Sequence, residues 1–371
     1  MTSSDTDPAS VPAADATPIL RARGVAVTFL GQRSSIERIR RQERVLRAVD
    51  GVDLDVFRGE ALAVVGESGS GKSTLAKAVT GLTPLSAGSL EFEGRTLTGR
   101  RSRSDTRRIQ MVFQDPYSSL NPRLTVGQIL KELLKVHHIV PDDELQSEAE
   151  SLLTRVGLTA DALGAYPRQF SGGQRQRVAI ARALALRPEV LVADEPVSAL
   201  DVSVQATILN LLEELRAEMG LTLLFIAHNL AVVHHLCDRV AVMYLGRIVE
   251  VAPTNRLFKQ PGHPYTRGLL EAIPRLTSSR AGKPPAVAGD PPSPLNIPSG
   301  CRFRTRCPRA EAICAEVDPP MLPAPGYVAA TTTDEHIAAC HFAFEAPGPR
   351  PVDGDSAAAP ASTEEPSSPR P

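Results

Sequence analysis

A glycine-rich segment contains the first residues whose types and spacing could do chemistry. Residues 66–73 read Gly-Glu-Ser-Gly-Ser-Gly-Lys-Ser and match G-x-x-x-x-G-K-[ST] at every position. Glycines let the backbone wrap a phosphate chain, so that N–H groups and the N-terminus of a following helix face the negative charge. Lys72 can reach the β- and γ-phosphates, and the Ser73 hydroxyl can ligate Mg²⁺. The candidate nucleotide-binding residues are Gly66, Glu67, Ser68, Gly69, Ser70, Gly71, Lys72, Ser73 and Thr74.

A pair of carboxylates supplies the second part of this chemistry. The apolar residues 190–193 predict a buried strand that ends at Asp194 and Glu195. Asp194 can hold the Mg²⁺ shell, and Glu195 is a candidate general base for the water that attacks the γ-phosphate. An isolated Asp-Glu pair after a strand is more often a surface feature. Downstream of a complete phosphate-binding loop, the pair predicts a hydrolytic site.

A third motif identifies a family. Residues 170–174 read Phe-Ser-Gly-Gly-Gln and resemble the signature motif of the ABC ATPases, which usually begins with Leu. In that family Ser171, Gly172, Gly173 and Gln174 would close over the γ-phosphate of ATP bound to a second subunit, so one chain would hold half of each site. The resemblance implies an α/β fold: a RecA-like P-loop core with an antiparallel β subdomain and an α-helical signature subdomain.

Further residues occur in the order expected of that family. Gln114 resembles the residue that senses Mg²⁺ and water, and residues 198–201 resemble a loop that crosses between subunits. His228 resembles the histidine that contacts the γ-phosphate. Phe29 is the candidate for stacking on adenine, although a strand phenylalanine is more often a core residue. The resemblance thus implies catalytic roles for Glu195, His228 and Gln114, and Mg²⁺ ligation by Ser73, Gln114 and Asp194.

The elements that must position these residues follow from hydrophobic periodicity. Strands are predicted at residues 19–29, 49–56, 61–65, 190–193 and 221–227, and helices at residues 73–81, 204–219 and within 127–164. A strand, a glycine-rich loop and a helix in succession indicate a parallel sheet. We expect an ABC nucleotide-binding domain over residues 19–262, with its helical subdomain at about 125–180. A charged insertion spans residues 30–47, and disordered tails are expected at residues 1–18 and 346–371.

Several stretches are similar to one branch of the family, the ATP-binding subunits of oligopeptide/dipeptide importers. They are residues 112–126, 194–202, 241–250, 262–270 and 291–294. The resemblance implies a heterodimer with a second ABC ATPase, two transmembrane permeases and an external substrate-binding protein. Uptake of nickel or another small solute, export, a non-transport ABC ATPase and a regulatory module that binds ATP without hydrolysing it remain alternatives.

Four cysteines fall in a proline-rich C-terminal extension predicted over residues 263–345. Cys301, Cys307, Cys314 and Cys340 suggest a staple, for which a bound metal suits a reducing compartment better than disulfides do. The family resemblance favours a [4Fe–4S] cluster. The spacing lacks the close C-x₂-C steps of familiar sites, so Zn²⁺ and plain reduced thiols remain alternatives. Four interleaved arginines could offset an anionic cluster: Arg302, Arg304, Arg306 and Arg309. Cys237 is expected to be an ordinary buried thiol.

Composition limits the other possibilities. The net charge is −1, which gives no indication of nucleic-acid binding. No run of about 18 apolar residues is present, so no membrane-spanning helix is expected. Residues 1–18 lack the basic start and apolar stretch of a signal peptide. We therefore expect a peripheral protein at the cytoplasmic face of the inner membrane, whose ATPase activity drives translocation through its partners.

Overall fold

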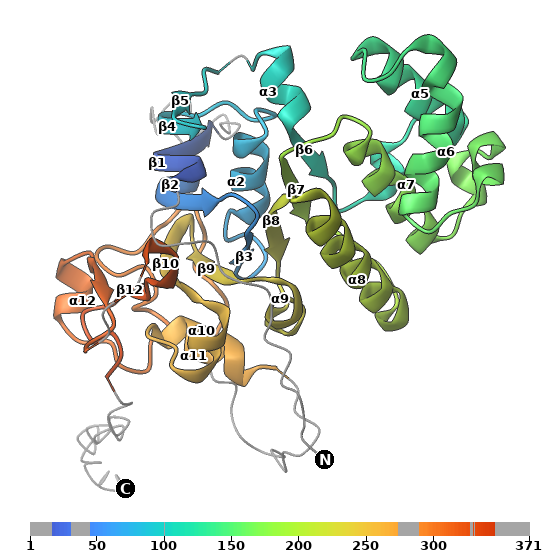
Figure 1. The fold of residues 1–371 in the computed structure, drawn as a ribbon. Coiled ribbons are helices and arrows are strands. Elements are labelled where there is room, and N and C mark those ends of the chain that lie inside the picture. The colour runs from blue at the N-terminus through green and yellow to red at the C-terminus, as the bar shows by residue number, and fades with distance from the viewer. Residues whose placement is uncertain are drawn as a thin grey trace, which may run out of the picture.

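The computed structural model describes residues 17–30, 45–99, 101–273, 289–326, 329 and 331–345. The predicted tails at 1–18 and 346–371 and the insertion at 30–47 fall almost entirely outside these ranges. Figure 1 shows three parts: a central α/β core, an arm of helices to one side of it, and a C-terminal part packed against the core on the opposite side.

A small antiparallel sheet covers one side of the core. Its strand order is β2-β1-β4-β5. The bounds are β1 Pro18–Leu30, β2 Val45–Phe57, β4 Ala87–Phe92 and β5 Arg95–Thr96. Apolar side chains on its inner face pack with α2 and one face of the large sheet in a single cluster that includes Val27, Leu54, Leu75 and Val192. This sheet is the predicted antiparallel subdomain.

The large sheet has the order β11-β12-β10-β9-β3-β8-β7-β6. Its central strands β9, β3, β8, β7 and β6 are parallel, and β10 returns antiparallel to β9. The bounds are β3 Ala61–Val65, β6 Ile109–Val112, β7 Val190–Asp194, β8 Thr222–Ala227, β9 Arg239–Tyr244 and β10 Arg247–Pro253. Every residue of β3, β7, β8 and β9 is buried, which explains their continuous apolar sequences. Because parallel strands share one carboxyl edge, the residues that follow β3, β7 and β8 are brought to the same place.

Helices flank the sheet or form the arm. Those beside the sheet are α2 Lys72–Val79, α3 Arg103–Arg108, α8 Val202–Met219, α9 Leu230–Leu236, α10 Thr254–Lys259 and α11 Pro264–Glu271. The helical arm comprises α4 Pro116–Ser119, α5 Val126–Val136, α6 Leu145–Arg155 and α7 Gly172–Leu184. The apolar positions recognised in the sequence, such as Leu130, Leu134 and Leu153, are fully buried between its helices.

The C-terminal extension joins the main sheet, which the sequence did not predict. It contains α12 Ile313–Glu316, β11 Met321–Pro323 and β12 Ile337–Ala339. Strand β12 pairs antiparallel with β10, aligning Glu250 with Ala338. The Glu250 carboxylate is fully buried and accepts hydrogen bonds from Gly262 N at 2.7 Å, His263 N at 2.9 Å and His336 Nε2 at 2.7 Å. The extension is therefore built into the core.

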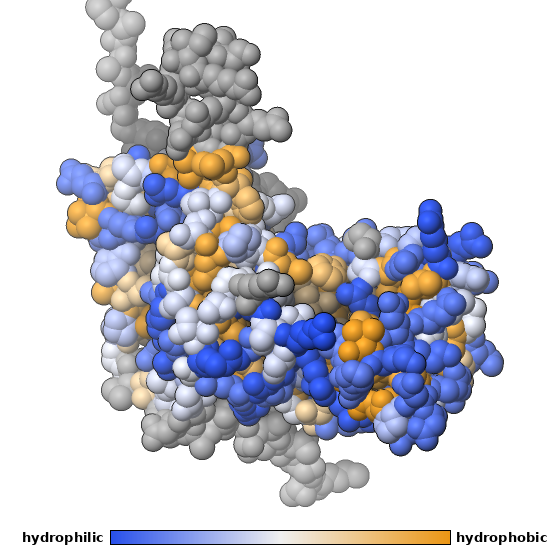
Figure 2. Space-filling model, turned by 90° about the horizontal axis from the view of Figure 1, so that it is seen from above, coloured by the Kyte–Doolittle hydropathy of each residue, from blue (hydrophilic) through white to orange (hydrophobic). Residues whose placement is uncertain are grey.

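In the described part of the chain, no helix is both long and apolar enough to span a bilayer. Figure 2 shows the molecule from above, with hydrophobic side chains in small separate groups among hydrophilic ones on that face.

Candidate functional site

The phosphate loop, residues 66–73, connects β3 to α2 at the carboxyl edge of the sheet. Its glycines have backbone shapes that other residues rarely adopt: Gly69 has φ +79° and Gly71 has φ +107°. Lys72 turns back into the loop, where its Nζ donates to Gly66 O at 2.8 Å and Glu67 O at 2.9 Å. Burial lowers the pKa of Lys72, while the nearby Glu195 carboxylate acts in the opposite direction.

The loop fits a phosphate chain. Ser70 Oγ is buried and has no hydrogen-bond partner among the described residues, so a polar group is available inside the loop. At Gly71 a Cβ would approach Ala48 O to 2.1 Å, so only glycine allows this course of the backbone. With the amides at the start of α2, these features form a cradle of the kind that binds anions.

The carboxylate pair lies beside the loop as predicted. Ser73 Oγ donates to Asp194 Oδ1 at 2.8 Å, which places two oxygens suited to Mg²⁺ next to each other. Burial raises the pKa of Asp194, and the Ser73 hydrogen bond opposes that shift. These two side chains come from α2 and from the end of β7, which the parallel order of the sheet makes close neighbours.

Glu195 is the centre of a hydrogen-bonded group. Its Oε2 lies 3.0 Å from His228 Nδ1 and 3.3 Å from Gln114 Nε2. Gln114 also contacts Ser198 Oγ at 3.4 Å. Glu195 has φ +45°, a left-handed backbone that costs free energy in a residue with a side chain and is typical of functional positions. The structure thus brings together all three residues predicted to be catalytic.

The signature residues lie elsewhere. Ser171 is the N-cap of α7: its hydroxyl accepts from Gln174 N at 3.3 Å, and Gln174 Oε1 accepts from Ser171 N at 2.9 Å. Gly173 packs so closely on α8 that a Cβ would meet Val204 Cγ1 at 2.4 Å. In Figure 1 the helix that they begin belongs to the arm, whereas the phosphate loop belongs to the core. Ser171 and Gln174 are exposed, so a second molecule can reach this helix start.

Phe29 lies at the end of β1 and is 44% exposed, unlike the core phenylalanines of the sheet. Its exposed side chain is available for stacking on an adenine base. The core alternative is therefore wrong for this residue.

The four C-terminal cysteines line a common cavity, which we call the thiol cavity. They form no disulfide. Arg309 N points to Cys307 Sγ and Phe342 N to Cys340 Sγ, each at 3.4 Å. Burial raises the pKa of Cys307 and of Cys340 to about 11. Cys237 lies apart and is buried, as expected.

Metal binding at the thiol cavity meets one restriction. Within the described residues, no group of three or more His, Cys, Asp or Glu side chains is arranged so that it could hold a metal ion.

Of the four arginines interleaved with the cysteines, two lie at the thiol cavity and two pair with carboxylates elsewhere. Arg304 and Arg309 line the thiol cavity. Arg302 instead pairs with Asp50, and Arg306 pairs with Glu67 in the phosphate loop. The expectation that all four offset an anionic cluster is therefore wrong for Arg302 and Arg306, because their guanidinium groups are directed at carboxylates of the core.

Two residues of the extension touch the phosphate loop and were not predicted as site residues. Tyr265 Oη accepts from Glu67 N at 2.8 Å. Arg306 donates to both carboxylate oxygens of Glu67, at 2.7 and 2.9 Å. The contact with Arg306 joins residues 239 positions apart, so no local pattern could have revealed it.

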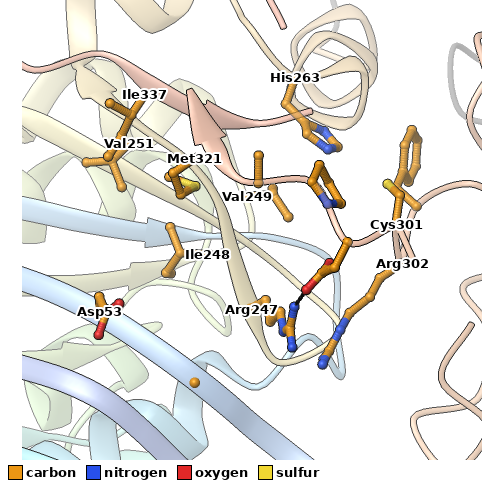
Figure 3. Close-up of a pocket in the computed structure, with 15 residues that line it drawn as sticks. Asp53, Arg247, Ile248, Val249, Val251, His263, Cys301, Arg302, Met321 and Ile337 are labelled. Atoms are coloured by element: carbon orange, nitrogen blue, oxygen red, sulfur yellow. Dashed lines mark hydrogen bonds and ion pairs between the residues drawn. The ribbon is translucent and has the colours of Figure 1, made fainter. Parts of the chain in front are cut away.

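A separate cavity of about 370 Å³ lies between β10 and the extension (Figure 3). Apolar residues such as Ile248 and Val251 form one wall, and Arg247 and Arg302 lie at its other end. Both arginines are already paired, Arg247 with Asp318 and Arg302 with Asp50. Their charges are therefore satisfied within the protein, and the cavity is distinct from the nucleotide site.

Comparison with known proteins finds matching families and relatives for most of the chain. The family model described as ABC transporter matches residues 49–198, and the model described as oligopeptide/dipeptide transporter, C-terminal region, matches residues 249–314. A putative peptide import ATP-binding protein of Brucella ovis is 47% identical over 306 residues, which cover 82% of this chain and 93% of the relative. The chain belongs to the ABC transporter ATP-binding family.

Other members are similarly close to this ABC ATPase. The oligopeptide transport ATP-binding protein OppF of Escherichia coli is 49% identical over 287 residues, covering 74% of this chain and 84% of OppF. A probable peptide ABC transporter ATP-binding protein of Sinorhizobium fredii is 50% identical over 300 residues, covering 80% and 83%.

Solved structures agree on the fold of the ABC ATPase core. The cbiO1 part of the ABC transporter complex cbiONQ of Clostridium perfringens matches with a TM-score of 0.55 and 29% identity, covering 66% of this chain and 91% of that one. An ATP-binding cassette in a post-hydrolysis state with ADP and Pi matches with a TM-score of 0.55 and 27% identity, covering 63% and 98%. The chain is an ABC-type ATPase with the predicted RecA-like α/β fold.

Proposed function

We propose that this chain is the ATP-hydrolysing subunit of an importer of oligopeptides or dipeptides. The observation that carries the cargo class is the match of residues 249–314 to the C-terminal region of oligopeptide/dipeptide transporters. Relatives with peptide import in their names, which span both the core and this region, support it. The alternatives of nickel uptake, export and a non-transport role have no comparable support.

In this proposal the nucleotide site works through the residues that the fold brings together. The phosphate loop and Thr74 cradle the triphosphate, while Ser73, Asp194 and Gln114 hold Mg²⁺ and its water. Glu195 accepts the proton of the attacking water, and His228 contacts the γ-phosphate. Phe29 stacks on adenine. The short distances of Gln114 and His228 to Glu195 support a shared catalytic role.

A second ATPase subunit completes each site. The exposed start of α7 at Ser171 presents a hydroxyl, glycine amides and a helix N-terminus, which suit the γ-phosphate of a neighbouring molecule's ATP. The partner ATPase would in turn offer its own signature to the phosphate loop of this chain. Two transmembrane permeases and an external substrate-binding protein complete the assembly, and this chain sits peripherally on the cytoplasmic face of the membrane.

The test is recovery of the assembly and its response to cargo. We expect affinity-tagged chain to copurify with two permeases and a second ATPase, and peptides presented by the binding protein to raise ATP hydrolysis severalfold. The Lys72→Ala variant should copurify with the same partners as the wild type, but peptides should not stimulate its ATP hydrolysis. Recovery without permeases, or stimulation by nickel ions and not by any peptide, would overturn the proposal.

We further propose that the thiol cavity holds a [4Fe–4S] cluster. The convergence of Cys301, Cys307, Cys314 and Cys340 on one cavity supports it, as do the backbone N–H groups aimed at two of the sulfurs. Cys301, Cys307, Cys314 and Cys340 would supply the four thiolates that hold the cluster. When bound, the cluster would cross-link residues 301–314 to residue 340.

Iron content tests this assignment. Anaerobically purified protein should be brown, with a broad visible absorption and about four irons per chain. Cys307→Ser should lose most of that iron, whereas Cys237→Ser should retain it because Cys237 lies outside the cavity. Colourless, iron-free protein from iron-replete cells would contradict the cluster assignment. One zinc ion per chain would show instead that the cysteines bind Zn²⁺.

A further inference from the structure

The C-terminal extension holds the second residue of the phosphate loop at both its backbone and its side chain. The Tyr265 hydroxyl accepts from the Glu67 amide at 2.8 Å. The Arg306 guanidinium forms a bidentate pair with the Glu67 carboxylate at 2.7 and 2.9 Å. Such fork-to-fork pairs are stronger and more directional than ordinary ion pairs.

Arg306 has its side chain next to a group of aromatic rings. Only 6% of its side chain is exposed, compared with 28% for Glu67. The guanidinium lies 5.9 Å from the centre of the Tyr244 ring, and Tyr244 packs against Tyr265 at 4.7 Å and against Phe303 at 5.3 Å. Tyr244 Oη also accepts a hydrogen bond from Arg306 Nη1 at 3.5 Å, so this aromatic group helps to orient the guanidinium toward Glu67.

Glu67 occupies a sensitive place in the loop. Its carbonyl oxygen and that of Gly66 accept the two hydrogen bonds of Lys72 Nζ, so the orientation of this peptide unit sets the position of the lysine. Its carboxylate is also a negative charge within a loop that must attract a triphosphate. An unpaired carboxylate there would repel the ligand, and the partly buried setting would weaken the screening of that repulsion.

We propose that Arg306 is a positioning residue for ATP: it pairs with the Glu67 carboxylate, which would otherwise repel the triphosphate, so that the extension controls nucleotide affinity. This inference rests on the proposed role of residues 66–73 in binding ATP. It assigns to the extension a function in the nucleotide site. Arg306 does not touch the reacting atoms, so its effect should appear in binding and not in the hydrolytic step.

The first test measures MgATP affinity of the full-length chain by titration calorimetry. Arg306→Gln should raise the dissociation constant about tenfold, because it leaves the Glu67 charge unpaired beside the phosphates. Arg306→Lys keeps the charge and loses the fork, so it should raise the constant only about threefold. The matched control is Arg247→Gln, which removes another arginine pair between core and extension but does not touch the loop, and should change the constant by less than about twofold.

A second substitution that restores MgATP affinity distinguishes this role of Arg306 from a general contribution to the stability of the fold. Glu67→Gln removes the charge and keeps the shape of the side chain, so it should bind MgATP more tightly than Arg306→Gln does. The double variant Arg306→Gln/Glu67→Gln should bind as Glu67→Gln does, because no carboxylate is left unpaired. Thermal unfolding without nucleotide reports whether each variant is folded. In the assembled transporter, Arg306→Lys should raise KM for ATP and leave kcat within about twofold.

The outcomes are distinct. Unchanged affinity in both Arg306→Gln and Arg306→Lys, while Lys72→Ala abolishes binding, would overturn this proposal and leave the proposed function standing. A double variant that binds as weakly as Arg306→Gln would also overturn it, because the unpaired carboxylate would not be the cause. Wild-type affinity in Lys72→Ala would instead mean that the proposed nucleotide site is wrong.

Discussion

Replacing Glu195 by Gln is expected to lower ATP turnover at least about 100-fold and to leave MgATP affinity within about threefold of the wild type. The amide keeps the shape of the side chain and can still meet His228 and Gln114, which lie 3.0 and 3.3 Å from the carboxylate. It cannot accept the proton of the attacking water. The phosphate loop and the Ser73–Asp194 pair are unchanged, so binding should survive the loss of chemistry.

This result is measured as phosphate release by the assembled transporter, with nucleotide binding determined separately. Glu214→Gln is the matched control: this carboxylate is exposed on α8, away from the site, and its replacement should leave turnover unaltered. Normal hydrolysis by Glu195→Gln would show that another group is the base.

Replacing Gly71 by Ala is expected to weaken MgATP binding by more than about 100-fold. A Cβ at this position would lie 2.1 Å from Ala48 O and 2.9 Å from Met243 Cε, and φ is +107°. The backbone oxygen of a paired strand cannot withdraw without moving β2, so the loop must change its course instead. An altered loop no longer directs its amides at the phosphates.

Gly69→Ala is the control for backbone strain alone. Gly69 also has positive φ, +79°, but nothing lies within 4 Å of its Cβ position. Strain of about 1–2 kcal/mol should then weaken binding by only about 5- to 30-fold. Calorimetric titration of both variants, with circular dichroism to establish folding, checks the contrast. Equal affinities for the two alanine variants would refute the steric argument.

The sequence predicted those parts of the fold in which a functional motif is contained in a short, recognisable stretch of residues. The phosphate loop and the strand ending at Asp194 can each be recognised within a dozen residues, through glycine spacing and an apolar run. Parallel strand order then determines that Ser73, Asp194 and His228 meet, because they follow strands that are neighbours in the sheet.

The parts of the fold that were not predicted depend on contacts between residues far apart in the sequence. Strands β11 and β12 have three residues each, too few for any alternation to be recognised. Arg306 is one of several arginines in a cysteine-rich loop. It pairs with Glu67 beside the packed rings of Tyr244 and Phe303, a contact that depends on tertiary structure. Sequence spacing suggested a role beside the thiols, whereas tertiary structure directs this side chain to the nucleotide loop.

The pairing of β12 with β10 also has a consequence during synthesis on the ribosome. His336, the third partner of the buried Glu250 carboxylate, is translated 86 residues after it, which takes about 4–17 s at ~5–20 residues per second. Throughout that interval β10 is an open sheet edge, and Glu250 lacks one of its hydrogen-bond donors. A nascent chain in which every nucleotide-binding motif has been synthesised therefore still has an incomplete sheet. Truncated products that end before residue 336 should be recognised by chaperones and proteases, although their ATP-binding motifs are intact.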